Sequence, residues 1–251
     1  MILRSIKLKI FYVDNRGFTL VELLVTLVIA GIIMTGVYSA FRTQQDSYIA
    51  QDQVVEMQQN IRSAFYIMAD ELRMAGYNID KNGDNAGTAG ITAASSASVT
   101  FTIVADTDSV DNNSDGTVDE AGELKTITYD HYDAYSSSDT NHLDVGRQVG
   151  GVKSAIAENI EQLEFFYTLA DGTQTTFSAA APTATDLENI RSVEISILAI
   201  TGRSDRNYTN TNQYCPASNP TCANTGTVWT VNDNFRRRFQ HMTVKLRNVG
   251  L

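Results

Sequence analysis

The most apolar stretch of the chain lies near its start, between Phe18 and Tyr38. An α-helix over these residues is about 31 Å long, which matches the hydrocarbon core of a bilayer. One acidic side chain, Glu22, stands close to the beginning of the stretch. A carboxylate within a spanning helix is costly and usually has a partner. The pattern therefore predicts a membrane-spanning helix over residues 18–38 with one functional carboxylate.

Beyond Tyr38 the sequence becomes polar but keeps a helical period. Apolar residues recur every three or four positions, at Val54, Met57, Ile61, Phe65, Met68, Leu72 and Ala75. No proline occurs between Phe18 and Pro182, and Gly76 is a plausible stop. We expect one helix from residue 18 to about residue 75, whose second part, residues 39–76, is an amphipathic stalk packed on a head.

After Gly76 the hydrophobic period changes from helical to that of β-strands. Alternating or β-rich runs occur at residues 99–104, 124–129, 162–168, 191–200 and 242–247. Residues 156–163 fit either a short helix or a strand. Several alternating strands predict an antiparallel sheet with one face in need of a cover, which the stalk would supply. The expected fold is α+β, with a β-rich head over residues 77–251.

The apolar stretch separates a basic segment from an acidic remainder. Four basic residues and one acidic residue precede it: Arg4, Lys7, Lys9, Arg16 and Asp14. The whole chain has a formal net charge of −10. Since basic residues mark the cytoplasmic end of a span, we expect the head to be translocated outward. The acidic balance argues against nucleic acid as a partner, because phosphate binding depends on Lys and Arg.

Two cysteines, Cys215 and Cys222, lie close together in a connection that we expect outside the cytoplasm. There a disulfide is the simplest interpretation, and a free, reduced pair is the alternative.

Nearby, Arg236-Arg237-Arg238 is a basic cluster in an acidic chain. It could bind an acidic partner subunit or form the solvated start of a strand.

A candidate calcium loop lies between two predicted strands. Its potential ligands are Asp111, Asn113, Asp115, Asp119 and Glu123. Their oxygens surround a turn-forming Gly116, as in calcium loops. The twelfth position of the EF-hand pattern is Gly122, however, so the last carboxylate is displaced by one residue. A solvated acidic turn is the alternative, and no other cofactor is indicated.

Catalytic motifs find little support in the sequence. The three histidines are scattered, at positions 131, 142 and 241, and no pair has metal-ligand spacing. There is no GxSxG, Walker or HExxH motif. We therefore predict that the protein is not an enzyme.

The segment Gly17-Phe18-Thr19-Leu20-Val21-Glu22 and its basic leader resemble the signature of type IV prepilins. The resemblance implies that residues 1–17 are a leader which a prepilin peptidase removes. Cleavage would fall between Gly17 and Phe18, Phe18 would be N-methylated, and Glu22 would be the assembly carboxylate. Unlike a secretory signal, this leader would be cut before the apolar stretch, so the helix would stay on the mature protein.

The layout beyond the leader is similar to that of PilW-type minor pilins. The likeness includes Ala75-Gly76-Tyr77 after the helix, an acidic loop before a strand, and the late triple arginine. It implies a subunit that initiates type IV pilus assembly at or near the pilus tip. Its partners would be other major and minor pilins and the inner-membrane assembly platform. The head would lie in the periplasm before assembly and at the cell surface afterwards.

Two other functions remain open at this point. A type II secretion pseudopilin shares the leader, the methylated Phe and the Glu. A tip adhesin would use the long connection over residues 202–235, which holds the cysteine pair.

Overall fold

The computed structural model describes residues 17–77, 90–104, 124–133, 143–223 and 227–249. The chain divides into two compact units, residues 1–49 and 50–251. One long helix, α1 (Leu20–Met74), contributes residues to both units.

In the first unit, the side chains of α1 are not buried against any other described part of that unit. Every residue from 20 to 49 is exposed, including long apolar side chains such as Leu27, Ile32 and Met34. By length and composition, α1 is the one helix among the described residues that could cross a membrane. A helix that is apolar on all sides suits lipid or other apolar helices better than water.

The ends of α1 lie close to the predicted ones, at residues 20 and 74 instead of 18 and about 75. Gly76 follows the helix with φ +77°, a left-handed conformation that ends many helices. Its N–H donates to the Thr102 carbonyl at 3.1 Å. A Cβ at this position would lie 2.8 Å from the Asn248 oxygen, so the close approach of the chain also requires glycine.

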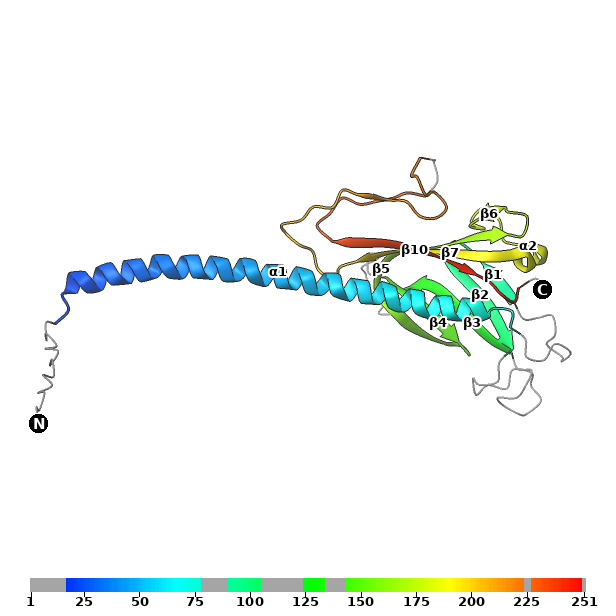
Figure 1. The fold of residues 1–251 in the computed structure, drawn as a ribbon, viewed down its shortest axis with the longest axis horizontal. Coiled ribbons are helices and arrows are strands. Elements are labelled where there is room, and N and C mark those ends of the chain that lie inside the picture. The colour runs from blue at the N-terminus through cyan, green and yellow to red at the C-terminus, as the bar shows by residue number, and fades with distance from the viewer. Residues whose placement is uncertain (1–16, 78–89, 105–123, 134–142, 224–226, 250–251) are drawn as a thin grey trace, which may run out of the picture. The chain divides into compact units, whose positions relative to one another are not determined.

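In the second unit, the predicted apolar stripe of α1 is buried. The buried helical residues are Met57, Ile61, Ala64, Met68, Ala69 and Leu72. Val54 and Phe65 are partly buried against the same core. The stripe packs on an antiparallel sheet, which confirms the α+β fold with the helix as the cover of one sheet face (Figure 1).

The main sheet has the strand order β1-β2-β3-β4-β5-β7-β10, with β6 paired to β5. The strands are β1 (Gly90–Ala94), β2 (Ser98–Val104), β3 (Leu124–Tyr132), β4 (Leu143–Val149), β5 (Val152–Leu169), β6 (Gln174–Thr175), β7 (Ile190–Ile200) and β10 (Arg237–Lys245). A short helix, α2 (Ala184–Asn189), precedes β7. Two short strands, β8 (Gln213–Tyr214) and β9 (Trp229–Thr230), form a second sheet within the connection from β7 to β10.

The first four predicted strands are present as parts of β2, β3, β5 and β7, and the fifth, residues 242–247, overlaps β10, which begins earlier, at Arg237, and ends at Lys245. The ambiguous segment, residues 156–163, is a strand and belongs to β5, which is longer than predicted. β1 and β4 were not predicted. β1 consists mostly of small residues with weak strand preference. In β4 two irregularities of register against β5 disturb the alternation of apolar and polar positions.

A cluster of three polar side chains joins α1 to the sheet within the second unit. Arg147 of β4 donates to the Glu71 carboxylate from Nε at 2.9 Å and from Nη2 at 2.5 Å. The hydroxyl of the buried Tyr129 on β3 donates to the same carboxylate. Burial and the hydrogen bond to Glu71 raise the pKa of Tyr129, so the phenol stays a donor. The cluster gives the apolar packing a defined register along the helix.

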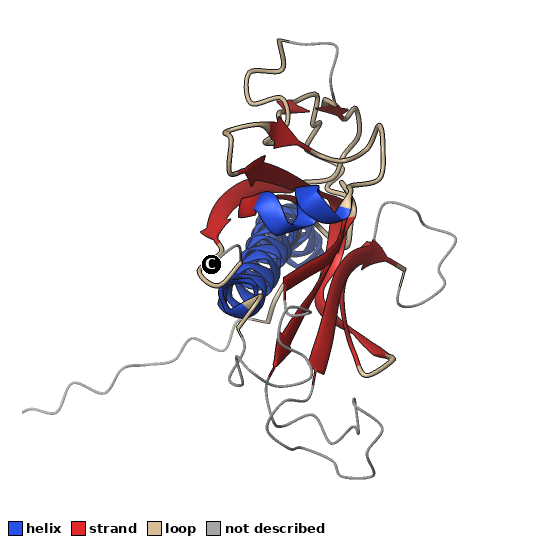
Figure 2. Cartoon of the chain, turned by 90° about the vertical axis from the view of Figure 1, so that its right-hand side faces the viewer, coloured by secondary structure: helices blue, strands red, loops and turns tan. Residues whose placement is uncertain are grey.

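The second face of the sheet is also covered, which the sequence did not predict for β7. Val193, Ile195 and Ile197 belong to the core with α1, but Ser196, Leu198 and Ile200 on the other face are buried too. The cover is the connection from β7 to β10. Figure 2 shows this connection and α1 on opposite sides of the strands.

Within the triple arginine, Arg237 is the first residue of β10 and its side chain is not solvated, whereas Arg238 is exposed. The side chain of Arg237 is only 1% exposed and binds Glu161 and Asp233, with Nη2–Oε1 at 2.9 Å and Nη1–Oδ1 at 2.6 Å. Burial alone would lower the pKa of Arg237, but the hydrogen bonds to Asp233 and Glu161 raise it. Glu161 reaches Arg237 from an irregularity of β5 between Ile160 and Gln162.

Replacing Arg237 tests the role of this buried ion pair. Arg237→Ala leaves the Glu161 carboxylate buried without its partner, so we expect a loss of about 3–5 kcal/mol in the free energy of unfolding. Urea unfolding of the detergent-solubilised chain measures the loss. Arg238→Ala is the matched control, because Arg238 is exposed, and should change stability by about 0.5 kcal/mol at most. Equal effects of the two substitutions would contradict a structural role for Arg237.

Candidate functional site

The predicted processing site lies just before the first turn of α1. Gly17 and Phe18 are outside the helix and exposed, Phe18 by 85%. The hydrogen bond that opens the helix runs from the Leu23 N–H to the Thr19 carbonyl at 3.2 Å. Cleavage between Gly17 and Phe18 would therefore break no helical hydrogen bond. The leader itself, residues 1–16, lies outside the described residues.

Glu22 is held by a reciprocal cap with Thr19. The N–H and the hydroxyl of Thr19 both donate to Glu22 Oε2 at 3.0 Å. In return, the Glu22 N–H donates to Thr19 Oγ1 at 3.3 Å. This is the capping box of a helix start, in which two otherwise unpaired N–H groups gain partners. Thr19 was not singled out from the sequence, although the spacing Thr-x-x-Glu indicates such a cap.

The other polar side chains of the apolar stretch are satisfied within the helix. Thr26 Oγ1 donates to the Leu23 carbonyl at 2.9 Å, and Thr35 Oγ1 donates to the Gly31 carbonyl at 2.8 Å. Such bonds hide a hydroxyl from an apolar surrounding. Glu22 is thus the one ionisable side chain between Phe18 and Tyr38. If assembly depends on a side-chain charge within this apolar stretch, the Glu22 carboxylate is the group that supplies it.

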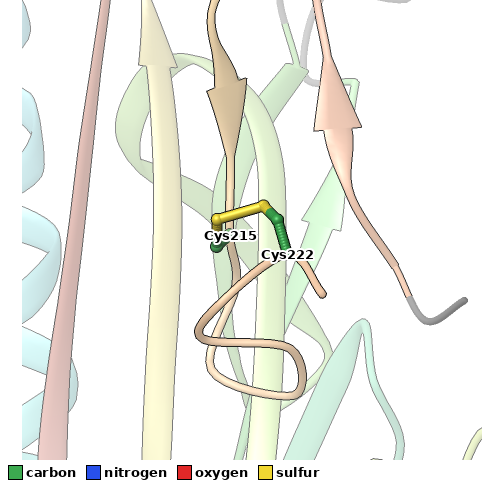
Figure 3. The surroundings of a disulfide bond; sticks show 2 residues. All are labelled: Cys215 and Cys222. Carbon is green, nitrogen blue, oxygen red and sulfur yellow. A yellow bond between two sulfur atoms is a disulfide. The ribbon is translucent and has the colours of Figure 1, made fainter. Parts of the chain in front are cut away.

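The cysteine pair forms the predicted disulfide, with the two Cα atoms 5.2 Å apart (Figure 3). The ring that it closes is bound to the second face of the sheet. The Ala217 N–H donates to the buried Ser196 hydroxyl at 3.0 Å. Ser218 donates to the Glu164 carboxylate from its N–H at 3.1 Å and from its hydroxyl at 2.7 Å. Burial raises the pKa of Glu164, while the hydrogen bonds from Ser218 oppose that rise.

The rest of the connection is attached at its two ends. Arg236 Nη2 binds Asp205 Oδ2 at 2.7 Å, and the Thr201 N–H donates to the Arg236 carbonyl at 3.0 Å. Asn210, which is buried, donates to the Tyr214 hydroxyl at 3.0 Å. Together with the ring, these bonds make the connection a second layer on the sheet.

The candidate calcium ligands, Asp111, Asn113, Asp115, Asp119 and Glu123, lie outside the described residues. Calcium binding by this loop stays a prediction. In the part of the chain that the structure describes, no three His, Cys, Asp or Glu side chains are grouped so that they could hold a metal ion.

Reduction of the disulfide tests how far the ring supports the head. Loop-closure entropy predicts a loss of about 2 kcal/mol in the free energy of unfolding. We expect the head to remain folded, because Ser196 and Glu164 still bind the ring. Urea unfolding with and without reductant measures the loss. The double variant Cys215→Ser, Cys222→Ser should match the reduced chain and be insensitive to reductant. Unchanged stability of the natural chain on reduction would contradict this role.

The chain is similar to known proteins in both of its parts. Residues 14–38 match the model of the prokaryotic N-terminal methylation motif. Residues 110–248 match the model of PilW, described as type IV pilus-assembly protein W. No curated protein matches the sequence. A solved type IV-like pilin from Thermus thermophilus is 15% identical with a TM-score of 0.47, covering 77% of this chain and 97% of its own. Because the PilW match spans more than half of the sequence, the chain belongs to the PilW family of type IV pilus-assembly proteins.

Proposed function

We propose that the chain is a minor pilin, a structural subunit that helps to initiate type IV pilus assembly and is incorporated at or near the pilus tip. The observation that carries the proposal is the position of Glu22. It lies in the capped first turn of a membrane-length helix, five residues into the chain that cleavage after Gly17 would leave. Membership of the PilW family supports the link to the pilus and a structural, non-enzymatic role.

The first step is processing by a prepilin peptidase. The enzyme cuts between Gly17 and Phe18 and methylates the new amine of Phe18. The exposure of both residues and their place before the helix support access of the peptidase. The match to the methylation motif supports the modification. The apolar part of α1 then keeps the subunit in the inner membrane, with the head in the periplasm.

The second step is pairing of charges between subunits. The new amine of Phe18 is positive, and a Glu22 carboxylate on a neighbouring helix can neutralise it. Both hydrogen bonds from Thr19 go to Oε2, and among the described residues no donor contacts Oε1. The cap thus orients the carboxylate and leaves one oxygen for the amine. Leaving either charge alone in an apolar surrounding is strongly unfavourable, so pairing sets the axial register of two subunits.

The partners in this proposal are other major and minor pilins, which the apolar surface of α1 contacts. In lipid, the exposed apolar side chains between Leu20 and Tyr38 need no further cover. Outside lipid they need the helices of neighbouring subunits, since water would leave a large apolar area exposed. The inner-membrane assembly platform would move the subunit from one surrounding to the other.

The secretion pseudopilus and the adhesin predict different phenotypes. A pseudopilin would share the processing and the Glu22 pairing, but its deletion would stop protein secretion and leave pili intact. An adhesin that uses the connection over residues 202–235 would leave piliation normal. The attachment of that connection to Glu164, Ser196 and Arg237 favours a structural layer instead.

Substitution of Glu22 tests the charge pairing. Both Glu22→Ala and Glu22→Gln remove the charge, but Gln keeps an acceptor for the Thr19 cap. We expect both variants to be cleaved normally and to enter pili at least about tenfold less than the natural chain, which corresponds to about 1.4 kcal/mol. Immunoblots of sheared pili and of membranes measure incorporation and cleavage.

The comparison of the two variants separates charge from capping. Incorporation of Glu22→Gln at the natural level, with a defect only in Glu22→Ala, would show that Glu22 serves the cap, and the proposed pairing would fail. Secretion is scored in the same strains. A secretion defect with normal piliation would assign the chain to the secretion pseudopilus.

A further inference from the structure

The connection from β7 to β10 contains the triplet Asn207-Tyr208-Thr209. Asn-x-Ser/Thr with a middle residue other than proline is the acceptor pattern of N-linked glycosylation. Asn207 and Thr209 are both exposed, whereas Tyr208 between them is half-buried. The pattern therefore coincides with an accessible asparagine on the surface of the head.

The backbone around the triplet forms a tight turn that other residues hold in place. The Asn207 N–H donates to Asp205 Oδ1, and the Tyr208 N–H donates to the Asp205 carbonyl, both at 3.0 Å. The Arg236 guanidinium lies 4.4 Å from the centre of the Tyr208 ring and also binds Asp205. Tyr208 is thus held by Arg236 against the rest of the connection, while Asn207 and Thr209 remain at the surface.

The two side chains that a glycosyl transfer needs are free. Among the described residues, no hydrogen bond engages the Asn207 carboxamide or the Thr209 hydroxyl. Asn210, three residues further on, contrasts with them. It is 1% exposed, and its carboxamide donates to the Tyr214 hydroxyl and the Phe235 carbonyl. Asn210 supports the structure of the connection, whereas Asn207 contributes no side-chain bond to it.

We propose that Asn207 is an N-glycosylation site. The donor is an oligosaccharide linked to a lipid pyrophosphate, and the catalyst is an oligosaccharyltransferase of the membrane. The carboxamide nitrogen of Asn207 bonds to the anomeric carbon of the first sugar. The bond from that carbon to the pyrophosphate oxygen breaks, the lipid pyrophosphate leaves with the electron pair, and the nitrogen loses one proton to a base.

The site rests on the proposed function in one respect, because the head must leave the cytoplasm to meet the donor. A glycan at Asn207 would add a bulky, hydrophilic group to the outer side of the connection. It would not disturb the side-chain contacts that hold this end of the connection, since these join Arg236 to Asp205 and Tyr208.

Peptide mass spectrometry of the full chain, purified from its own cells, tests the site. Tryptic peptides that end at Arg236 contain Asn207 together with Cys215 and Cys222. One spectrum therefore reports the glycan mass on Asn207 and the loss of two hydrogens on disulfide formation. Mapping at the level of peptides is needed because Asn112-Asn113-Ser114, outside the described residues, has the same pattern.

We expect a glycan on Asn207 in the natural chain and in Thr209→Ser, which keeps the pattern. It should be absent from Asn207→Gln and Thr209→Ala, and all of these positions are exposed, so each variant should fold. An unmodified Asn207 beside an intact disulfide would overturn the site and leave the proposed function standing. Reduced cysteines with an unmodified Asn207 would overturn both, since the head would then have stayed in the cytoplasm.

Discussion

The helix α1 needs two different surroundings along its length. Helical hydrogen bonds pair its backbone groups within the helix, but its apolar side chains need a cover from outside the helix. From Leu20 to Ile49 every residue is exposed, and as far as Tyr38 most of these residues are apolar. From Met57 to Leu72 the apolar residues occupy one stripe, and the sheet covers it. One part therefore needs lipid or other helices, while the other part is the core of the head. This division suits a membrane-anchored subunit of the PilW family.

Polar groups fix the layers of the head on one another. Glu71, Arg147 and Tyr129 join the helix to the sheet, and Glu161, Arg237 and Asp233 join the sheet to the connection that covers its second face. Glu164 and Ser196 bind the disulfide ring at the same face. Apolar packing alone tolerates small slips of one layer on another, whereas buried ion pairs and hydrogen bonds do not. The head is consequently a three-layer structure of helix, sheet and connection.

Much of this could be predicted because it depends on short-range patterns. The apolar period marks α1 and its buried stripe, and alternation marks β2, β3, β5, β7 and β10. β4 escaped prediction because its bulges break the alternation. The burial of Arg237 could not be foreseen, since its partner Glu161 is 76 residues away and sits at a strand irregularity. The position of the cysteine ring on the sheet could not be foreseen either, because its partners Ser196 and Glu164 are also distant in the sequence. The Thr19 cap, in contrast, depends on the local spacing Thr-x-x-Glu, so it could have been predicted from the sequence.

On the proposed function, the mature protein begins at a processed Phe18 and keeps the apolar helix that follows it. The mass and N-terminal sequence of the chain purified from membranes or pili test it directly. We expect a chain that starts at N-methylated Phe18 and contains the whole apolar stretch from Phe18 to Tyr38. A chain that starts at Met1, or one that has lost the helix by cleavage after Tyr38, would contradict it.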